Sequence, residues 1–360
     1  MKTIVFLVSQ LINSGPENVV FYICCNLDRR LYKPIVFSLK GEDPSKSIEN
    51  KFKDIDVDIY HFDASTIELE ITPWKIAKKI QDKITDLKCD ILHVHCYHPN
   101  LVGVYIDGVK KIATVHQISG EDFLMKKGQI MGRYMKFRFD RTLKHYDRIV
   151  VLSNYMRNYY KGCCDNLIKI PNGVSRPKVV DSDISIEERG VHPVVLVTGT
   201  LSDRKNVTYL LSELKKSGQK FDCYILGSGV KYNDCLDIIN GDSRFHMEGF
   251  KENVWEYLSN TDLYVSASKS EGLPMSVLEA LNTGVPCLLS EIPPHSEIVS
   301  DLNIHGVELF ELKEGALKDK FDDMICSRYN RKEIELKSKE LYSSMAMTKL
   351  YESLYDDCLK

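Results

Sequence analysis

The stretch Ser270-Glu271-Gly272-Leu273-Pro274-Met275-Ser276-Val277-Leu278-Glu279-Ala280 runs directly into Leu281-Asn282-Thr283-Gly284-Val285-Pro286. Pro274 suits the first position of a helix, and Gly284 followed by proline supplies its stop. The pattern therefore predicts a short helix with Glu271 in the loop that enters it and Glu279 in its body. Five residues of helix separate Pro274 from Glu279, which is a rise of about 7.5 Å.

This helix start favours a phosphate flanked by hydroxyl groups. The backbone amides at Leu273 to Met275 have no partner within the helix, and such amides favour an anion. Two carboxylates beside a phosphate would repel it, so we expect them to accept hydrogen bonds from hydroxyl groups on either side. A nucleotide-sugar offers ribose, diphosphate and sugar in that order. The alternative is a capped amphipathic helix with two solvated glutamates.

Length and composition indicate a soluble protein of two domains. The chain has 360 residues, 43% hydrophobic content and a net charge of −3. This length suits two domains of ordinary size, and the charge gives no reason to expect nucleic acid as a partner. No run is as long as a membrane span, and Met1 to Val8 is better explained as a buried first strand than as a signal peptide.

Cysteine usage predicts a reducing compartment. The chain has eleven scattered cysteines and no C-x-x-C pair. This spacing argues against both a zinc site and a disulfide framework. We therefore expect a cytoplasmic protein.

Short β-rich runs alternate with longer helical patterns, which is typical of parallel βαβ units. We predict an α/β fold of two doubly wound, Rossmann-like domains that face a central cleft, with domains at 1–175 and 193–340 and a linker at 176–192. The predicted strands are Thr3 to Val8, Lys33 to Ser38, Ile91 to His95, Lys111 to Val115, Arg148 to Leu152, Pro193 to Thr198, Asp222 to Leu226, Phe245 to Glu248, Leu263 to Ala267 and Pro286 to Ser290.

Glycines and a basic pair follow several of these strands. Arg204 and Lys205 come after the first strand of the second domain, where they could neutralise a diphosphate leaving group; the alternative is a solvated basic turn. Glycines at strand ends let backbone approach a ligand closely, although they are also common structural residues. The candidate donor-binding residues are Gly15, Gly199, Gly227, Gly249, Phe250, Gly272, Leu273, Pro274, Met275 and Glu279.

Histidines end two neighbouring strands of the first domain. His93 and His95 alternate onto one face of a strand, but without a nearby acidic or cysteine cluster we explain them as part of a half-buried strand rather than as a metal pair. His116 ends the next strand, where cleft residues are found, and its neutral imidazole could bind sugar hydroxyls or guide a proton. We expect no metal and no cofactor.

Residues 126–148 form a basic stretch with interleaved aromatic residues. This pattern fits an amphipathic helix resting on an anionic membrane surface. It fits equally a helix whose aromatic residues pack on the sheet and whose charges face solvent.

Taken together, these residues resemble the family 4 retaining glycosyltransferases of the GT-B fold, over essentially the whole chain. The specific parts are the E-x7-E motif at Glu271 and Glu279, the Glu279-Ala280-Leu281 helix with its Gly284-Val285-Pro286 stop, and Ile170-Pro171-Asn172-Gly173-Val174. Weaker matches are Gly15-Pro16-Glu17, Asp147 to Ser153, Leu226-Gly227-Ser228-Gly229 and Tyr351 to Tyr355.

The resemblance implies a role for each site residue. Glu271 would hold hydroxyls of the donor sugar near the reacting carbon, and Glu279 would bind the ribose. Arg204 and Lys205 would stabilise the departing diphosphate without a metal, and His116 would line the donor-sugar and acceptor side. The last helix, within 341–360, would cross back onto the first domain.

Two positions depart from the family pattern. Thr200 stands where many members have an arginine, which leaves the role of Arg204 less secure than that of Lys205. Ser14 stands where the first of two glycines is usual, and this weakens the expected contact of Gly15 with the diphosphate.

The resemblance implies a cytoplasmic, metal-independent retaining transferase. It would move a hexose from a nucleotide-sugar, a UDP-sugar by preference, to a growing lipid-linked surface glycan such as a capsule or O-antigen repeat unit, at the inner face of a membrane. The alternatives are a non-catalytic glycan-binding or partner subunit of a transferase complex and a GT-B nucleotide-sugar epimerase.

Overall fold

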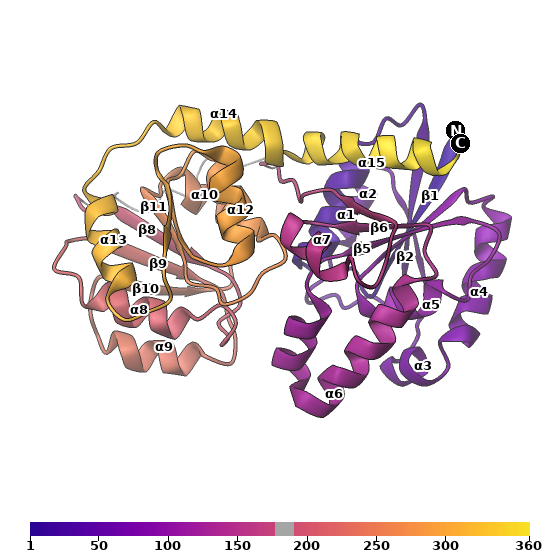
Figure 1. Ribbon diagram of the computed structural model, residues 1–360, viewed down its shortest axis with the longest axis horizontal. Helices are drawn as coiled ribbons and strands as arrows, with labels where there is room; N and C mark the ends of the chain where they lie inside the picture. Colours follow the sequence, from indigo (N-terminus) through magenta and orange to yellow (C-terminus); the bar gives the residue numbers. More distant parts are fainter. Residues whose placement is uncertain (177–190) are drawn as a thin grey trace. The chain divides into compact units, whose positions relative to one another are not determined.

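The computed structural model describes residues 1–176 and 191–360, which divide into two compact units (Figure 1). Unit 1 comprises Met1–Gly173 together with Ser344–Lys360, and unit 2 comprises Val174–Ser343. Most of the predicted linker at 176–192 lies outside the described residues.

Unit 1 is built on a fully parallel seven-stranded sheet. Its strands are β1 (Lys2–Val8), β2 (Tyr32–Ser38), β3 (Asp58–His61), β4 (Ile91–His95), β5 (Lys110–Val115), β6 (Arg148–Val151) and β7 (Leu167–Lys169), in the order β3-β2-β1-β4-β5-β6-β7. Its helices are α1 (Gly15–Asn26), α2 (Glu49–Lys53), α3 (Thr66–Ile71), α4 (Pro73–Asp86), α5 (Tyr97–Gly103), α6 (Ser119–Leu143), α7 (Asn154–Tyr160) and α15 (Ser344–Cys358).

Unit 2 repeats this plan with a parallel six-stranded sheet. Its strands are β8 (Val194–Thr198), β9 (Asp222–Leu226), β10 (Phe245–Gly249), β11 (Leu263–Ser266), β12 (Cys287–Ser290) and β13 (Val307–Phe310), in the order β10-β9-β8-β11-β12-β13. Its helices are α8 (Val207–Lys215), α9 (Tyr232–Ile239), α10 (Val254–Ser259), α11 (Met275–Asn282), α12 (Pro293–Leu302), α13 (Ala316–Ile325) and α14 (Arg331–Tyr342).

Each sheet has a point where the strand order reverses. The chain moves outward from β1 to β3 and then returns to place β4 beside β1, and in the same way β11 returns beside β8. In doubly wound sheets ligands bind beyond the carboxyl ends of the strands at such points. The loops expected to bind ligands are therefore those after β1 and β4 in unit 1, and those after β8 and β11 in unit 2.

The sequence predicts the central strands well and misses three edge strands. All ten predicted strands occur, and their ends agree with the structure within one residue. The missed strands β3, β7 and β13 each lie at a sheet edge and are only three or four residues long. Edge strands are half exposed and carry polar residues, so they lack the continuous apolar run that marks a strand buried on both faces.

Helix α15 packs on unit 1 beside α1 (Figure 1). Tyr355 Oη lies 2.9 Å from His93 Nδ1, and Asn26 Nδ2 donates to Ser344 Oγ at 3.0 Å. Among the described residues, the structure has no helix that is both long and apolar enough to cross a membrane.

Candidate functional site

The candidate site in unit 2 lies in the loops after β8 and β11, at the point where the strand order reverses. The first loop carries Arg204 and Lys205 and ends at α8; the second carries Glu271 and ends at α11. Two hydrogen bonds join these loops: Lys269 N donates to Arg204 O at 2.8 Å, and the Arg204 side chain donates from Nη1 to Ser270 O at 2.8 Å. The topology thus brings together residues 66 positions apart in sequence.

Glu271 forms a buried ion group with both cations. Its Oε2 lies 2.7 Å from Arg204 Nη1, and its Oε1 lies 2.7 Å from Lys205 Nζ. Ser268 Oγ also donates to Oε1 at 2.8 Å. The carboxylate side chain is only 6% exposed, and those of Arg204 and Lys205 are 18% and 14% exposed. The sequence analysis assigned each of these residues a role of its own, and it did not predict that they form ion pairs with one another.

This group carries a net positive charge. Burial alone would raise the pKa of Glu271, but Lys205 and Arg204 outweigh it and lower the pKa to about 2. One carboxylate therefore faces two cations, which leaves one unit of positive charge in a poorly solvated place. Such a site is suited to bind an anion, since charge-assisted hydrogen bonds are stronger away from water.

Three glycines let the surrounding loops pack backbone against backbone. A Cβ on Gly227 would lie 1.9 Å from Gly199 O, and one on Gly229 would lie 2.3 Å from Leu201 O. A Cβ on Gly199 would lie 3.1 Å from Lys205 Cε, so the lysine stem runs across this glycine. The structure thus gives Gly227 a packing role, while a side chain on Gly199 would crowd the stem of Lys205.

Helix α11 begins one residue later than predicted. Met275 is its first residue and Pro274 is the N-cap, with φ −75° and ψ 114° and no side-chain cap. The residues Gly272, Leu273 and Pro274 are buried, whereas Met275 and Glu279 are half-buried. Proline fixes φ at a helical value but not ψ, so the extended ψ of Pro274 delays the helix.

His295 is a residue of this region that the sequence analysis missed. Its Nδ1 donates to Ser290 O at 2.8 Å, and its Nε2 is buried without a hydrogen-bond partner in the described part of the chain. Burial lowers the pKa of His295 to about 4, and the charges of Glu271 and Lys205 also act on it. The signal available in the sequence was a histidine in the first turn of the helix that follows β12.

Gly249 and Phe250 lie further along the sheet, at the end of β10. Gly249 has φ +70°, and its carbonyl accepts from Gly227 N at 2.7 Å. Phe250 is 59% exposed.

In unit 1, His93 and His95 lie on β4, and His116 directly follows β5. His95 Nδ1 and His116 Nε2 are 2.9 Å apart, while His93 contacts Thr114 Oγ1 at 2.7 Å. All residues of β4 are buried, so the expected half-buried strand is wrong; helices cover both faces of a parallel sheet. Burial lowers the pKa of His116 to about 3, so its ring is neutral above that pH.

The first turn of α1, which follows β1, contains a buried carboxyl group. Gly15 opens α1, and Glu17 in its first turn is 5% exposed and accepts from Ser14 Oγ. Burial is the main cause that raises the pKa of Glu17 to about 7. The predicted glycine turn therefore occurs beside an acid that is largely protonated below that pH.

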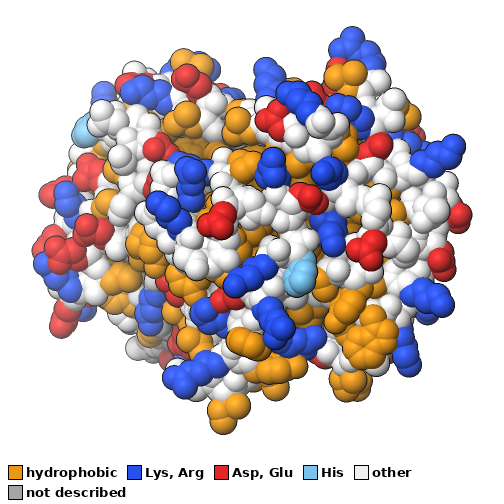
Figure 2. Space-filling model, turned by 45° about the vertical axis from the view of Figure 1, so that its right-hand side comes forward, with side chains coloured by type: hydrophobic (Ala, Val, Ile, Leu, Met, Phe, Trp, Pro, Cys, Tyr) orange, Lys and Arg blue, Asp and Glu red, His pale blue; other side chains and the backbone are white. Residues whose placement is uncertain are grey.

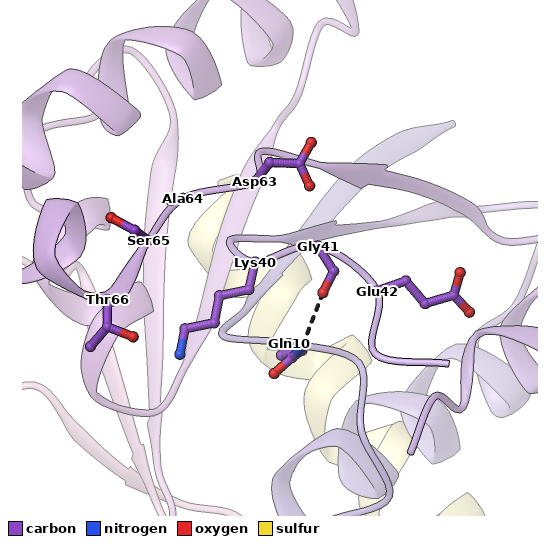
Figure 3. Close-up of a pocket in the computed structure, with 8 residues that line it drawn as sticks. All are labelled: Gln10, Lys40, Gly41, Glu42, Asp63, Ala64, Ser65 and Thr66. Atoms are coloured by element: carbon purple, nitrogen blue, oxygen red, sulfur yellow. Dashed lines mark hydrogen bonds between the residues drawn. The ribbon is translucent and has the colours of Figure 1, made fainter. Parts of the chain in front are cut away.

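A polar hollow of about 410 Å³ lies beyond β1, β2 and β3 (Figure 3). The Lys40 side chain extends toward the wall that Ser65 and Thr66 form, and Gln10 Nε2 donates to Gly41 O at 3.0 Å. Its other lining residues are Glu42, Asp63 and Ala64. Within the described ranges no group of three or more histidine, cysteine or acidic residues is arranged to hold a metal ion.

Two family models match the chain. The model described as Glycosyltransferase Family 4 matches residues 13–176, and the model described as Glycosyl transferases group 1 matches residues 182–340. Two relatives match nearly the whole length of this chain. An uncharacterised glycosyltransferase of Methanocaldococcus jannaschii is 27% identical over 92% of this chain and 93% of its own. The O-antigen biosynthesis glycosyltransferase WclY of Escherichia coli is 21% identical over 91% and 98%.

Two further matches carry ligands in their names. The UDP-Gal:alpha-D-GlcNAc-diphosphoundecaprenol alpha-1,3-galactosyltransferase of Escherichia coli is 26% identical over 59% of this chain and 61% of its own. The crystal structure of Anabaena HepE in complex with UDP and glucose superposes with a TM-score of 0.78 at 14% identity, covering 99% and 100% of the two chains. At this identity, the second match shows a shared fold.

Proposed function

The chain belongs to the group 1 glycosyltransferases of the GT-B fold, and from this membership we propose a retaining enzyme that transfers a hexose from a UDP-sugar to a lipid-linked glycan. The observation that carries the proposal is the buried group of Glu271, Arg204 and Lys205. Its excess positive charge suits the diphosphate that departs from the donor.

The donor and acceptor are proposed from the relatives. HepE is crystallised with UDP and glucose, and the galactosyltransferase is named for a UDP-sugar donor and a diphosphoundecaprenol-linked acceptor. Relatedness to an O-antigen transferase supports a surface glycan as the product. The polar hollow around Lys40 offers hydrogen-bonding groups that suit sugar hydroxyls on the acceptor.

Retention of configuration is supported by the state of Glu271. A carboxylate with a pKa near 2, held by two cations, is a weak base and a weak nucleophile. We therefore propose that the acceptor hydroxyl attacks C1 on the face that UDP leaves. The C1–O bond to phosphate breaks, the C1–O bond to the acceptor forms, and a phosphate oxygen of the leaving UDP takes the hydroxyl proton.

The test is a thermal-shift panel of UDP, GDP, ADP and CMP, followed by transfer from the matching sugars to glycan diphosphate-lipid acceptors. We expect UDP to raise the melting temperature by mass action and the product to keep the donor's anomeric configuration by NMR. Lys205→Gln should lower turnover by about 100-fold. Lys269→Gln, on the same pair of loops but exposed, is the matched control.

Three results would contradict the proposal. Failure to bind any nucleoside diphosphate would favour a non-catalytic partner subunit. An altered nucleotide-sugar formed without an acceptor would indicate an epimerase, and an inverted anomeric centre would reject the retaining step.

A further inference from the structure

Helix α6 is a helical hairpin rather than one straight helix. Gly128 has φ +74° and ψ −179°, which breaks the helix into arms at 119–127 and 129–143. The arms cross closely at Gly132, where a Cβ would lie 2.6 Å from Phe123 O. The stretch 126–148 was expected to form a single amphipathic helix. In the structure the chain folds back at Gly128, and α6 ends at Leu143.

The base of this hairpin is fixed to unit 1. Ser119 N donates to Tyr160 Oη at 2.9 Å, and Ser119 Oγ donates to Asp140 at 2.7 Å. Phe139 is 4% exposed and packs edge-on against Phe123. These contacts hold the two arms together at their base.

The far end, residues 124–138, combines exposed apolar side chains with positive charge. It contains five cations and no acidic residue, but Lys126, Lys136 and Arg138 are ion-paired with Asp122, Asp140 and Glu70, so two positive charges remain unpaired within the described part of the chain. Residues 125–131 are all exposed. Five large apolar side chains are at least half exposed, namely Met125 (54%), Ile130 (89%), Met131 (52%), Tyr134 (50%) and Phe137 (64%). We call residues 124–138 the tip.

The α6 hairpin projects from unit 1 (Figure 1). In Figure 1, α6 reaches lower than the other labelled helices of unit 1. Figure 2 shows hydrophobic and basic side chains along the lower edge of the face that it presents. Exposed apolar groups of this density usually mark an interaction surface.

We propose that the tip docks on an anionic lipid surface, with its apolar side chains among the acyl chains and its cations at the headgroups. The inference rests on the proposed transfer to a lipid-linked acceptor, because it supplies the surface where that acceptor is found. Lysine and arginine stems can lie along the apolar layer while their charges stay at the headgroups. Lys127 and Arg133 have no ion-pair partner recorded in the described ranges, so their charge is available to phosphate headgroups.

Packing on the sheet does not account for these residues. The residues of α6 that pack inward are Phe139 and Leu143, which are buried, whereas Ile130 and Phe137 are exposed. A protein partner would also accept an apolar surface, but the cations Lys127 and Arg133, unpaired among the described residues, lie among the exposed apolar side chains and favour an anionic layer.

The test is flotation of the purified full chain with vesicles. We expect binding to vesicles of phosphatidylglycerol and phosphatidylcholine, weak binding to phosphatidylcholine alone, and release by salt. Lys127→Gln with Arg133→Gln should lose about 30-fold in partitioning, and Ile130→Ser should lose roughly tenfold. The matched controls in unit 1 are Lys51→Gln with Lys88→Gln, both exposed, and Ile67→Ser, which is 70% exposed; they should partition like the wild type.

The results separate docking from the transferase proposal. UDP binding and turnover of a detergent-soluble acceptor should be unchanged in the tip variants. A variant that keeps both is folded, so its loss of vesicle binding reports lost docking and not misfolding. A wild-type chain that ignores anionic vesicles, or tip variants that bind as well as the controls, would overturn the docking while leaving the transferase proposal intact. Equal binding to neutral and anionic vesicles would overturn the proposed contact between the cations of the tip and the headgroups. Vesicle binding without UDP binding would support docking and reject the transferase proposal.

Discussion

Lys205 Nζ lies 2.7 Å from Glu271 Oε1, and both side chains are largely buried at the point where the strand order of unit 2 reverses. A third group, Arg204, forms an ion pair with the other oxygen of the Glu271 carboxylate. A buried charge without a partner is costly. The three side chains therefore hold one another in place before any substrate arrives, and each is expected to affect stability as well as activity.

Glu271→Gln should make unit 2 less stable at neutral pH and flatten its response to acid. Lys205 and Arg204 lower the folded pKa of Glu271 to about 2 from an ordinary value of 4.5. The stability this group contributes is therefore present above about pH 4.5 and is lost as the pH falls toward 2. Removing one partner of a buried ion pair costs on the order of 3 kcal/mol. Urea unfolding of wild type and variant between pH 3 and 8 measures both effects.

The difference between the two curves should be largest near pH 7 and should shrink in acid. Glu340→Gln, at an exposed position of unit 2, is the control. Parallel curves for Glu271→Gln and wild type would show that the carboxylate is not held by these cations in solution.

Gly227→Ala should destabilise unit 2 strongly, whatever Gly227 does for a ligand. Its Cβ would lie 1.9 Å from Gly199 O, and its φ of +150° is unfavourable for alanine. We expect a loss of about 3 kcal/mol or failure to fold. Gly218→Ala is the matched control, since a Cβ there meets nothing within 4 Å. Similar chemical denaturation midpoints for the two variants would contradict the packing role.

These residues also show where sequence reasoning stops. The central strands were predicted because burial on both faces leaves a continuous apolar run, and the Glu271 loop was located because helix start and stop signals are local. The contact of Glu271 with Arg204 and Lys205 depends on β8 and β11 lying side by side, although β8 ends at Thr198 and β11 begins only at Leu263. No local pattern encodes that adjacency. The hairpin of α6 was hidden because α6 contains three glycines, Gly120, Gly128 and Gly132, and the sequence does not show which of them adopts the φ of +74° that breaks the helix.

Glu17→Gln should stabilise unit 1 in a pH-dependent way. Burial raises the folded pKa of Glu17 to about 7 from an ordinary value of 4.5, so the folded chain prefers the neutral acid. Below about pH 4.5 both states are protonated and there is no cost. Between 4.5 and 7 the unfolded chain ionises first, and stability is lost until the cost is complete above 7. Glutamine mimics the neutral acid at every pH.

The melting temperature of Glu17→Gln should therefore match wild type near pH 4 and exceed it by several degrees at pH 8, for a gain on the order of 3 kcal/mol. Asp82→Asn, an exposed position of the same unit, is the control and should not show this trend. A variant less stable than wild type at pH 8 would mean that Glu17 is held as a carboxylate.

His95→Phe should slow transfer without weakening UDP binding. His95 Nδ1 lies 2.9 Å from His116 Nε2, so it orients the ring that ends β5. It is itself fully buried, which makes it a positioning residue. Phenylalanine keeps the ring volume but removes the contact, and losing one such hydrogen bond corresponds to about a tenfold fall in kcat. His95→Asn places a nitrogen near the Nδ1 position and should recover much of the rate. His145→Asn, at an exposed site of unit 1, should behave as wild type. If phenylalanine and asparagine at position 95 gave equal rates and an unchanged pH profile, His95 would have only a packing role.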